Sequence, residues 1–202
     1  MAPSGAREEP AGKAADPSGV KASPAIFLIG YRGSGKTAVG KVLSERLGKP
    51  FYDTDAVIEG ELGTTIVKYF AEHGEAAFRA TESEVLETIL ERIRAGERPV
   101  VATGGGIVLA RGNVTCMRQS GVVVWLVAAA ETLKRRIGSD PASGRARPAL
   151  RGVSSIDEVG EVLKAREPVY RAAAHFSVST DGLSPGEVAA KVLAFLSCAA
   201  GA

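Results

Sequence analysis

The octapeptide GYRGSGKT, residues 30–37, constrains the fold more than any other part of the chain. It follows the apolar run AIFLI and precedes a segment whose apolar residues recur at helical spacing through Leu47. The spacing Gly30–x4–Gly35–Lys36–Thr37 is that of the Walker A phosphate loop, which requires a strand before it and a helix after it. Its glycines let successive backbone N–H groups turn toward a phosphate, and the start of the helix adds partial positive charge. The sequence therefore predicts a nucleoside triphosphate site, with Lys36 on the outer phosphates and Thr37 on Mg²⁺.

The remainder of the chain predicts an α/β fold. Short apolar runs typical of buried strands alternate with segments of helical periodicity, which indicates a parallel sheet covered by helices on both faces. The strands are predicted in AIFLIG, PFYDTD, RPVVATGGG, GVVVWLVA and FSVST. The helices are predicted over 36–47, 66–74, 74–94, about 131–138, 155–169 and 185–196.

Two segments fall outside this alternation. Residues 1–23 are mainly Ala, Gly, Pro, Ser and mixed charge, and we expect a disordered tail ahead of a single domain over 24–202. Residues 138–152 hold three glycines, two prolines and three arginines, so this segment cannot lie in the hydrophobic core. This segment is either a disordered connection or a mobile lid.

Charge and composition exclude several classes of protein. A formal net charge of +2 without a basic block argues against a nucleic-acid partner. No apolar run approaches the roughly 20 residues of a membrane span, so no membrane partner is expected. Two cysteines form no disulfide framework, and we expect a reduced, cytoplasmic setting.

Asp53 and Asp55 are predicted to end the second strand, where ligands of open α/β sheets gather. One carboxylate would serve a metal and the other a substrate hydroxyl; the alternative is a helix N-cap. Gly104–Gly106 end the third strand, and either admit a ligand against bare backbone or form a tight turn.

Three arginines stand near these motifs: Arg79 in EAAFRATE, Arg147 in RARP and Arg166 in KAREPVY. The guanidinium fork binds carboxylate and phosphate in two-point geometry. The alternative for each is an ordinary solvated surface residue. Arg147 lies in the predicted lid, from which an arginine can close over phosphates.

Taken together, these motifs resemble the shikimate kinase family in order and approximate spacing. The resemblance runs from Ile26 to about Leu196 and rests on GYRGSGKT, DTD, FR before an acidic helix, GGG, RP in the lid and REPVY. It implies transfer of the γ-phosphoryl of ATP to the 3-hydroxyl of shikimate, within chorismate and aromatic amino-acid biosynthesis. It also implies a three-layer P-loop fold like that of the nucleoside monophosphate kinases, with a five-stranded parallel sheet in the order 2-3-1-4-5. We expect a monomer.

The resemblance also implies a role for each matched residue. The residues expected around ATP are Gly33, Ser34, Gly35, Lys36, Thr37, Ala38, Arg136 near the adenine, and Arg147 from the lid. Mg²⁺ is expected on Thr37 and, through its waters, on Asp53. The residues expected around shikimate are Asp55, Arg79, Gly104, Gly105, Gly106 and Arg166, with Asp55 as the base. Catalysis is expected from Lys36, Asp55 and Arg147.

The sequence departs from the family in its lid, which is longer between Arg136 and Arg147 and reads RPAL where a bulkier residue commonly follows the proline. Residues 1–23 match nothing in the family. Two alternatives remain: a kinase for another polyol acid such as gluconate, and a non-catalytic relative that binds or regulates. The second would have lost Lys36, Asp55 or an arginine, and all are present.

Overall fold

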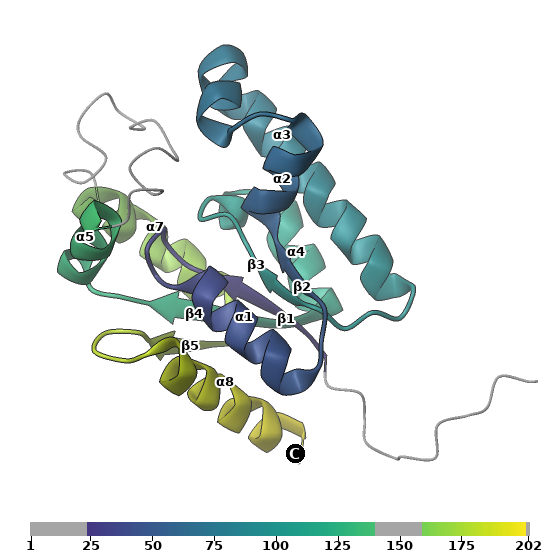
Figure 1. Cartoon of the computed structure of the whole chain (residues 1–202), viewed down its shortest axis with the longest axis vertical. Helices are drawn as coiled ribbons and strands as arrows, with labels where there is room; N and C mark the ends of the chain where they lie inside the picture. The colour runs from purple at the N-terminus through teal and green to yellow at the C-terminus, as the bar shows by residue number, and fades with distance from the viewer. Residues whose placement is uncertain (1–23, 140–158, 201–202) are drawn as a thin grey trace, which may run out of the picture.

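The computed structural model describes residues 24–139 and 159–200 (Figure 1). The predicted tail, all but the first two residues of the predicted lid, and Arg147 lie outside these residues.

A five-stranded parallel sheet forms the middle layer, in the order β2-β3-β1-β4-β5, as expected from the resemblance. The strands are β1 (Ala25–Ile29), β2 (Phe51–Asp53), β3 (Val100–Ala102), β4 (Gly121–Val127) and β5 (Phe176–Ser179). The central strand, β1, pairs with β3 and β4, so that Leu28 lies between Ala102 and Val124. All five of its side chains are completely buried. The phosphate loop therefore leaves the most enclosed strand of the sheet.

Helices cover both faces, as predicted. They are α1 (Lys36–Leu47), α2 (Thr54–Leu62), α3 (Ile66–Arg94), α4 (Arg111–Ser120), α5 (Ala130–Ser139), α7 (Val159–Ala173) and α8 (Pro185–Ala200), with the 3₁₀ turn η1 (Ile107–Leu109). The two helices predicted over 66–94 are one element that is broken at Gly74, whose φ of 79° and ψ of 177° are not helical.

The prediction that the second strand runs through Asp55 is wrong. β2 ends at Asp53, and Asp55 lies in the first turn of α2, a helix that the hydrophobic pattern did not reveal. The Asp53 carboxylate accepts hydrogen bonds from the N–H groups of Asp55 and Ala56, which ends the strand and starts the helix.

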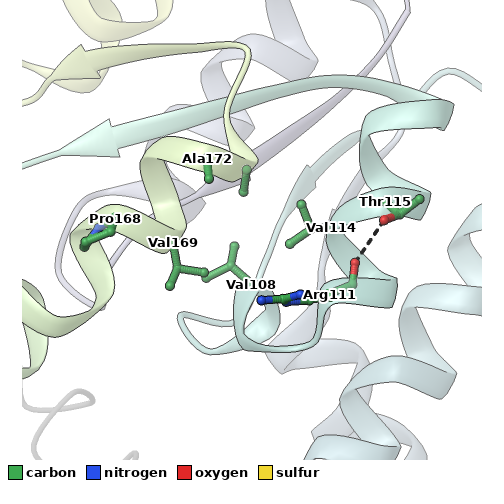
Figure 2. Close-up of a pocket in the computed structure, with 8 residues that line it drawn as sticks. Val108, Arg111, Val114, Thr115, Pro168, Val169 and Ala172 are labelled. Atoms are coloured by element: carbon green, nitrogen blue, oxygen red, sulfur yellow. Dashed lines mark hydrogen bonds between the residues drawn. The ribbon is translucent and has the colours of Figure 1, made fainter.

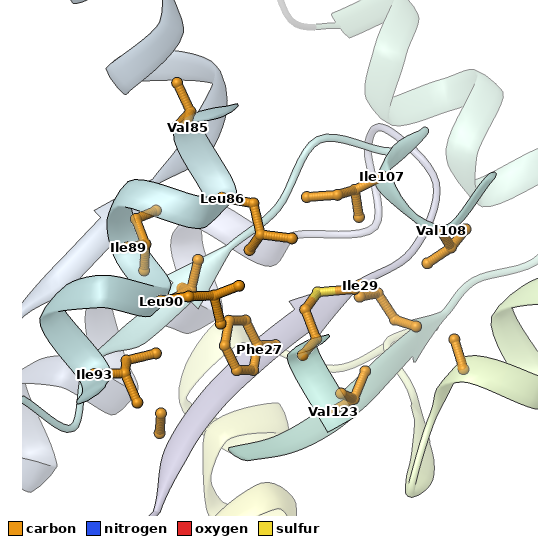
Figure 3. Packing of buried hydrophobic residues seen from close by; sticks show 14 of the residues in the cluster. Phe27, Ile29, Val85, Leu86, Ile89, Leu90, Ile93, Ile107, Val108 and Val123 are labelled. Carbon is orange, nitrogen blue, oxygen red and sulfur yellow. The ribbon is translucent and has the colours of Figure 1, made fainter. Parts of the chain in front are cut away.

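Side chains of β1 alternate between two hydrophobic layers. Phe27 and Ile29 pack with Leu86 and Leu90 of α3 and with η1 (Figure 3). Ile26 and Leu28, on the opposite face, pack in a second cluster with residues of α1 and α8. Each such buried side chain stabilises the fold by about 1.5–3 kcal/mol relative to an exposed one. None of the helices in the described ranges combines the length and apolarity that crossing a bilayer requires.

Candidate active site

The phosphate loop sits between β1 and α1, as predicted. Gly35 is the N-cap of α1 with φ 92° and ψ 14°, a left-handed conformation that glycine adopts at little cost. Among the described residues no side chain caps the helix, and its first turn holds no acidic residue. The positive end of the helix dipole at this terminus therefore favours a bound anion.

Two side chains inside the loop fit a polyanion. Ser34 is 1% exposed, and its hydroxyl has no hydrogen-bond partner among the described residues. A buried hydroxyl without a partner is destabilising, and a bound phosphate oxygen would supply one. The Lys36 ammonium donates to the carbonyl oxygens of Gly30 (2.9 Å) and Tyr31 (3.0 Å), which holds its charge across the loop.

Thr37 and Asp53 are brought together as predicted for a metal site. The Thr37 hydroxyl donates to Asp53 Oδ2 over 2.7 Å, while Oδ1 of the same carboxylate caps α2. The N-cap alternative for Asp53 is therefore confirmed, while its other carboxylate oxygen lies beside Thr37. A hydroxyl and one carboxylate suit Mg²⁺, which keeps several waters and takes few protein ligands. The described residues hold no cluster of three or more His, Cys, Asp or Glu side chains that could bind a metal ion.

A hydrogen bond links this site to the turn formed by residues 104–106, called the glycine turn below. The buried Thr54 hydroxyl accepts from the N–H of Gly104 over 2.8 Å. Thr54 lies between Asp53 and Asp55, and all three begin or precede α2. The bond therefore fixes the position of Asp55 relative to residues 104–106.

Gly105 receives two hydrogen bonds from α7. Its carbonyl oxygen accepts from the Tyr170 hydroxyl at 2.5 Å and from Arg166 Nη1 at 3.4 Å. Tyr170 is fully buried and stacks on Trp125 of β4, with ring centroids 5.8 Å apart. The half-buried Arg166 guanidinium is thereby held beside the turn.

Arg79 reaches the same turn from α3. A Cβ atom at Gly106 would lie 2.1 Å from Arg79 Nη1, so the guanidinium occupies the space that a side chain there would fill. Nη1 also donates to the buried carboxylate of Glu82 at 2.8 Å, and Nη2 donates to Glu75 at 3.1 Å. Burial opposes the charge of Arg79, but the carboxylate of Glu82, with that of Glu75, raises its pKa above the ordinary value. Arg79 is therefore a fixed cation.

Arg136 connects the phosphate loop to the segment after β5. Its guanidinium donates to the carbonyl of Gly33 (3.2 Å) and to the hydroxyl (3.0 Å) and carbonyl (2.7 Å) of Thr180. The next residue, Asp181, accepts from the N–H of Ala129 just before α5. A hydrogen bond from the Thr132 side chain is the main cause that lowers the pKa of Asp181.

The structure thus brings most of the predicted residues to the carboxyl ends of β1, β2 and β3. The residues that it places there are Gly33, Ser34, Gly35, Lys36, Thr37, Asp53, Asp55, Arg79, Gly104, Gly105, Gly106 and Arg166. Ala38 lies in the first turn of α1 and is exposed.

Sequence reasoning missed Thr54, Glu82, Tyr170 and Thr180. The available signals were local: Thr54 stands inside DTD, and Tyr170 ends REPVY. Glu82 follows Arg79 at i+3, a spacing at which helical side chains meet. Nothing in the sequence around Thr180 predicts its bond to Arg136.

Comparison with known proteins gives consistent matches. The family model described as shikimate kinase matches residues 32–197. A shikimate kinase of Symbiobacterium thermophilum is 43% identical over 171 residues, which cover 83% of this chain and 93% of that protein. One of Paracidovorax citrulli is 46% identical over 157 residues, covering 77% and 82%.

Among solved structures, a shikimate kinase from Acinetobacter baumannii in complex with shikimate superimposes with a TM-score of 0.78 at 34% identity. The match covers 87% of this chain and 93% of that one. Sequence and fold therefore agree over nearly the whole of the described residues.

Proposed function

This chain belongs to the shikimate kinase family, and from that premise we propose how its side chains divide the work of the reaction. The protein transfers the γ-phosphoryl of ATP to the 3-hydroxyl of shikimate, giving shikimate 3-phosphate and ADP, in chorismate and aromatic amino-acid biosynthesis. The main support for this division is the arrangement around the glycine turn. Arg79 and Arg166 reach the turn from different helices, and a hydrogen bond to Thr54 connects it to the start of α2.

At the nucleotide end, the loop amides and Ser34 hold the phosphates, and Lys36 moves from the carbonyls of Gly30 and Tyr31 onto the outer phosphates. Thr37 and Asp53 would hold Mg²⁺, whose chemistry is to neutralise charge on the β- and γ-phosphates. Support for this comes from the 2.7 Å bond that already joins the two side chains. Arg136 keeps the loop that follows β5 against the phosphate loop, next to the adenine.

At the substrate end, Arg79 and Arg166 bind the shikimate carboxylate with charge-assisted hydrogen bonds. The glycines at 104–106 let the ring lie against the backbone. Asp55 accepts hydrogen bonds from the hydroxyls and takes the proton of the attacking one. The two ends suit a small anion with hydroxyls, which needs cations on one side and a carboxylate on the other.

Arg147, which lies outside the described residues, is assigned from the sequence alone. We place it over the transferring phosphoryl group, where its charge stabilises the transition state. Arg147→Ala is then expected to lower kcat more than it raises the KM for shikimate. A pure change in KM would contradict this role.

The reaction is proposed to take place in the cytoplasm, in a monomer. Cys116 and Cys198 are free thiols, which fits a reducing compartment. Leu109 is the one exposed large apolar side chain among the described residues, so these residues show no broad apolar surface for a permanent partner.

A coupled assay of ADP release tests the function, with ³¹P NMR to identify the product. Shikimate is expected to stimulate ADP release, and gluconate at the same concentration is not. Equal turnover of gluconate, or Mg²⁺-independent turnover, would contradict the proposal.

A further inference from the structure

A cavity of about 420 Å³ lies behind the glycine turn, between η1 and α4 on one side and α7 on the other (Figure 2). Its walls are mostly apolar, with Val108, Val114, Pro168, Val169 and Ala172 around one charged residue, Arg111. None of these residues belongs to the site described above. The volume is in the range that small-molecule ligands occupy and is too small for a helix.

Arg111 gives the cavity a definite charge. It is exposed at the start of α4, and Figure 2 shows its side chain beside Val108 at the edge of the cavity. Within the described ranges its guanidinium has no hydrogen bond or ion pair, and the first turn of α4 holds no acidic residue. Leu109, two residues before Arg111, is 43% exposed. An apolar cavity with one cation at its edge is complementary to an organic anion with an apolar body.

The walls of the cavity belong to the elements that hold the substrate turn. Val108 follows Gly106 by two residues in η1. Pro168, Val169 and Ala172 share α7 with Arg166 and Tyr170, the two residues that donate to the Gly105 carbonyl. A molecule that moves α7 relative to η1 therefore changes the length of these two bonds.

We propose that this cavity is a regulatory site for a small monocarboxylate with an aromatic or aliphatic body, held by Arg111 and the valine walls. Its occupation shifts α7 and weakens shikimate binding, so that the KM for shikimate rises while kcat changes less. This coupling rests on the proposed role of Arg166 and Gly105 in shikimate binding. The binding itself does not.

Binding is tested first, on the full-length protein, with 3-phenylpropionate as the probe and 3-phenylpropanamide as its uncharged counterpart. Calorimetry gives the affinity, and the emission of Trp125, the one tryptophan of the chain, reports on the stacked Tyr170 of α7. We expect saturable binding below about 10 mM and at least about tenfold weaker binding of the amide. No saturable binding in that range would overturn the proposal.

Variants locate the probe. Ala172→Phe fills the mouth of the cavity from an exposed position and is expected to abolish binding, whereas Ala172→Ser keeps it. Arg111→Gln is expected to remove the preference for the acid over the amide. Lys41→Gln makes the same change in charge on an exposed position of α1 and is expected to change nothing. Unchanged binding in Ala172→Phe would mean that the probe occupies another site, and would overturn the proposal.

Coupling is tested last. Saturating shikimate is expected to lower the affinity for the probe by the same factor by which the saturating probe lowers the affinity for shikimate. Complete competitive displacement that persists in Ala172→Phe would place the probe in the shikimate site and overturn the regulatory role. Probe binding without any effect on shikimate would do the same. If shikimate were not the substrate, turnover would be missing from every variant while the calorimetric binding remained, so the two failures are distinguishable.

Discussion

The Thr37 hydroxyl donates a 2.7 Å hydrogen bond to Asp53, the last residue of β2, although β3 lies between β2 and β1, the strand that precedes the phosphate loop. The other oxygen of the same carboxylate caps α2. One side chain thus orients the proposed metal site and starts the helix that carries Asp55. Substitutions of Asp53 can therefore remove the negative charge at the proposed metal site while keeping the hydrogen-bond acceptor that caps α2.

Asp53→Asn is expected to raise the Mg²⁺ concentration required for half-maximal activity while leaving the melting temperature close to wild type. Asparagine caps helices about as well as aspartate, but it brings no charge to a cation. Asp53→Ala is the matched variant, and it should in addition lower the free energy of unfolding by about 1 kcal/mol. Mg²⁺ titrations of activity and urea denaturation measure the two effects. An unchanged Mg²⁺ requirement in both variants would remove Asp53 from the metal site.

Asp55→Asn is expected to lower kcat by about a hundredfold or more, because the carboxylate that takes the proton of the 3-hydroxyl is lost. ADP affinity should hardly change, since the phosphates are held by residues 30–37. Steady-state kinetics and ADP calorimetry separate the two effects. Retention of more than about a tenth of the rate, or a failure corrected by added Mg²⁺, would contradict the assigned role.

Gly106→Ala is expected to raise the KM for shikimate by about tenfold or more and to lower the free energy of unfolding, because Arg79 is also the partner of the buried Glu82 carboxylate. Its φ of −104° and ψ of −5° suit any residue, so the effect is steric: the new methyl displaces the Arg79 guanidinium. Gly60→Ala is the control, because a Cβ there meets nothing within 4 Å. A normal KM in Gly106→Ala would show that the position of Arg79 at this turn does not matter for binding.

Glu82→Gln is expected to destabilise the protein by about 3 kcal/mol and to weaken shikimate binding, because it removes one partner of a buried ion pair. Glu82 is 1% exposed and lies 2.8 Å from Arg79. Glu75→Gln removes the other partner of Arg79, but that carboxylate is 50% exposed, and a loss of less than about 1 kcal/mol is expected. Denaturant unfolding and shikimate KM are the readouts. Equal effects of the two variants would show that burial of the pair does not matter.

Stability is expected to fall below about pH 6.5, in part through His175. The Nδ1 atom of this histidine accepts the N–H of Val123, the third residue of β4, over 2.9 Å. Burial, and then the charge of Arg118, lower its pKa in the folded protein. The unfolded chain therefore binds a proton at a higher pH than the folded one, so the free energy of unfolding decreases as pH falls through the ordinary histidine range.

The matched variants are His175→Asn, which keeps an acceptor near Val123 but does not titrate, and His73→Asn on the exposed surface of α3. Unfolding by urea between about pH 5 and pH 8 should show a flatter profile for the first variant only. Identical slopes in all three proteins would assign the acid sensitivity to other groups.

The strands β1, β3 and β4 were predictable because each is a short apolar run, and the sheet order followed from the family resemblance. The helix α2 was not, because its buried residues are only Thr54 and Ile58, which is too few for a periodic pattern. Its start depends on the Asp53 cap, and this shifted Asp55 from a strand to a helix. The predicted position of Asp55, just after the second strand, is close to the observed one, but its predicted secondary structure is wrong.

The hydrogen bonds that hold the site together were beyond prediction for a different reason. Thr54 meets Gly104 and Tyr170 meets Gly105 only because the parallel sheet brings distant segments to one edge. No local pattern records such a contact. The residues that we propose face ligands were predicted through their chemistry, whereas the residues that hold the turn in place, Thr54 and Tyr170, belong to types that carry no such signal.

The place of β1 at the centre of the sheet has a consequence for how the protein is made. Ile26 pairs with Val100 and Ile29 with Trp125, so the strand that carries the phosphate loop finds its neighbours only in residues synthesised much later. We expect this apolar segment to remain unpaired until β3 has been synthesised, and to keep one open edge until β4 follows, a period in which it is prone to aggregate or to be bound by chaperones.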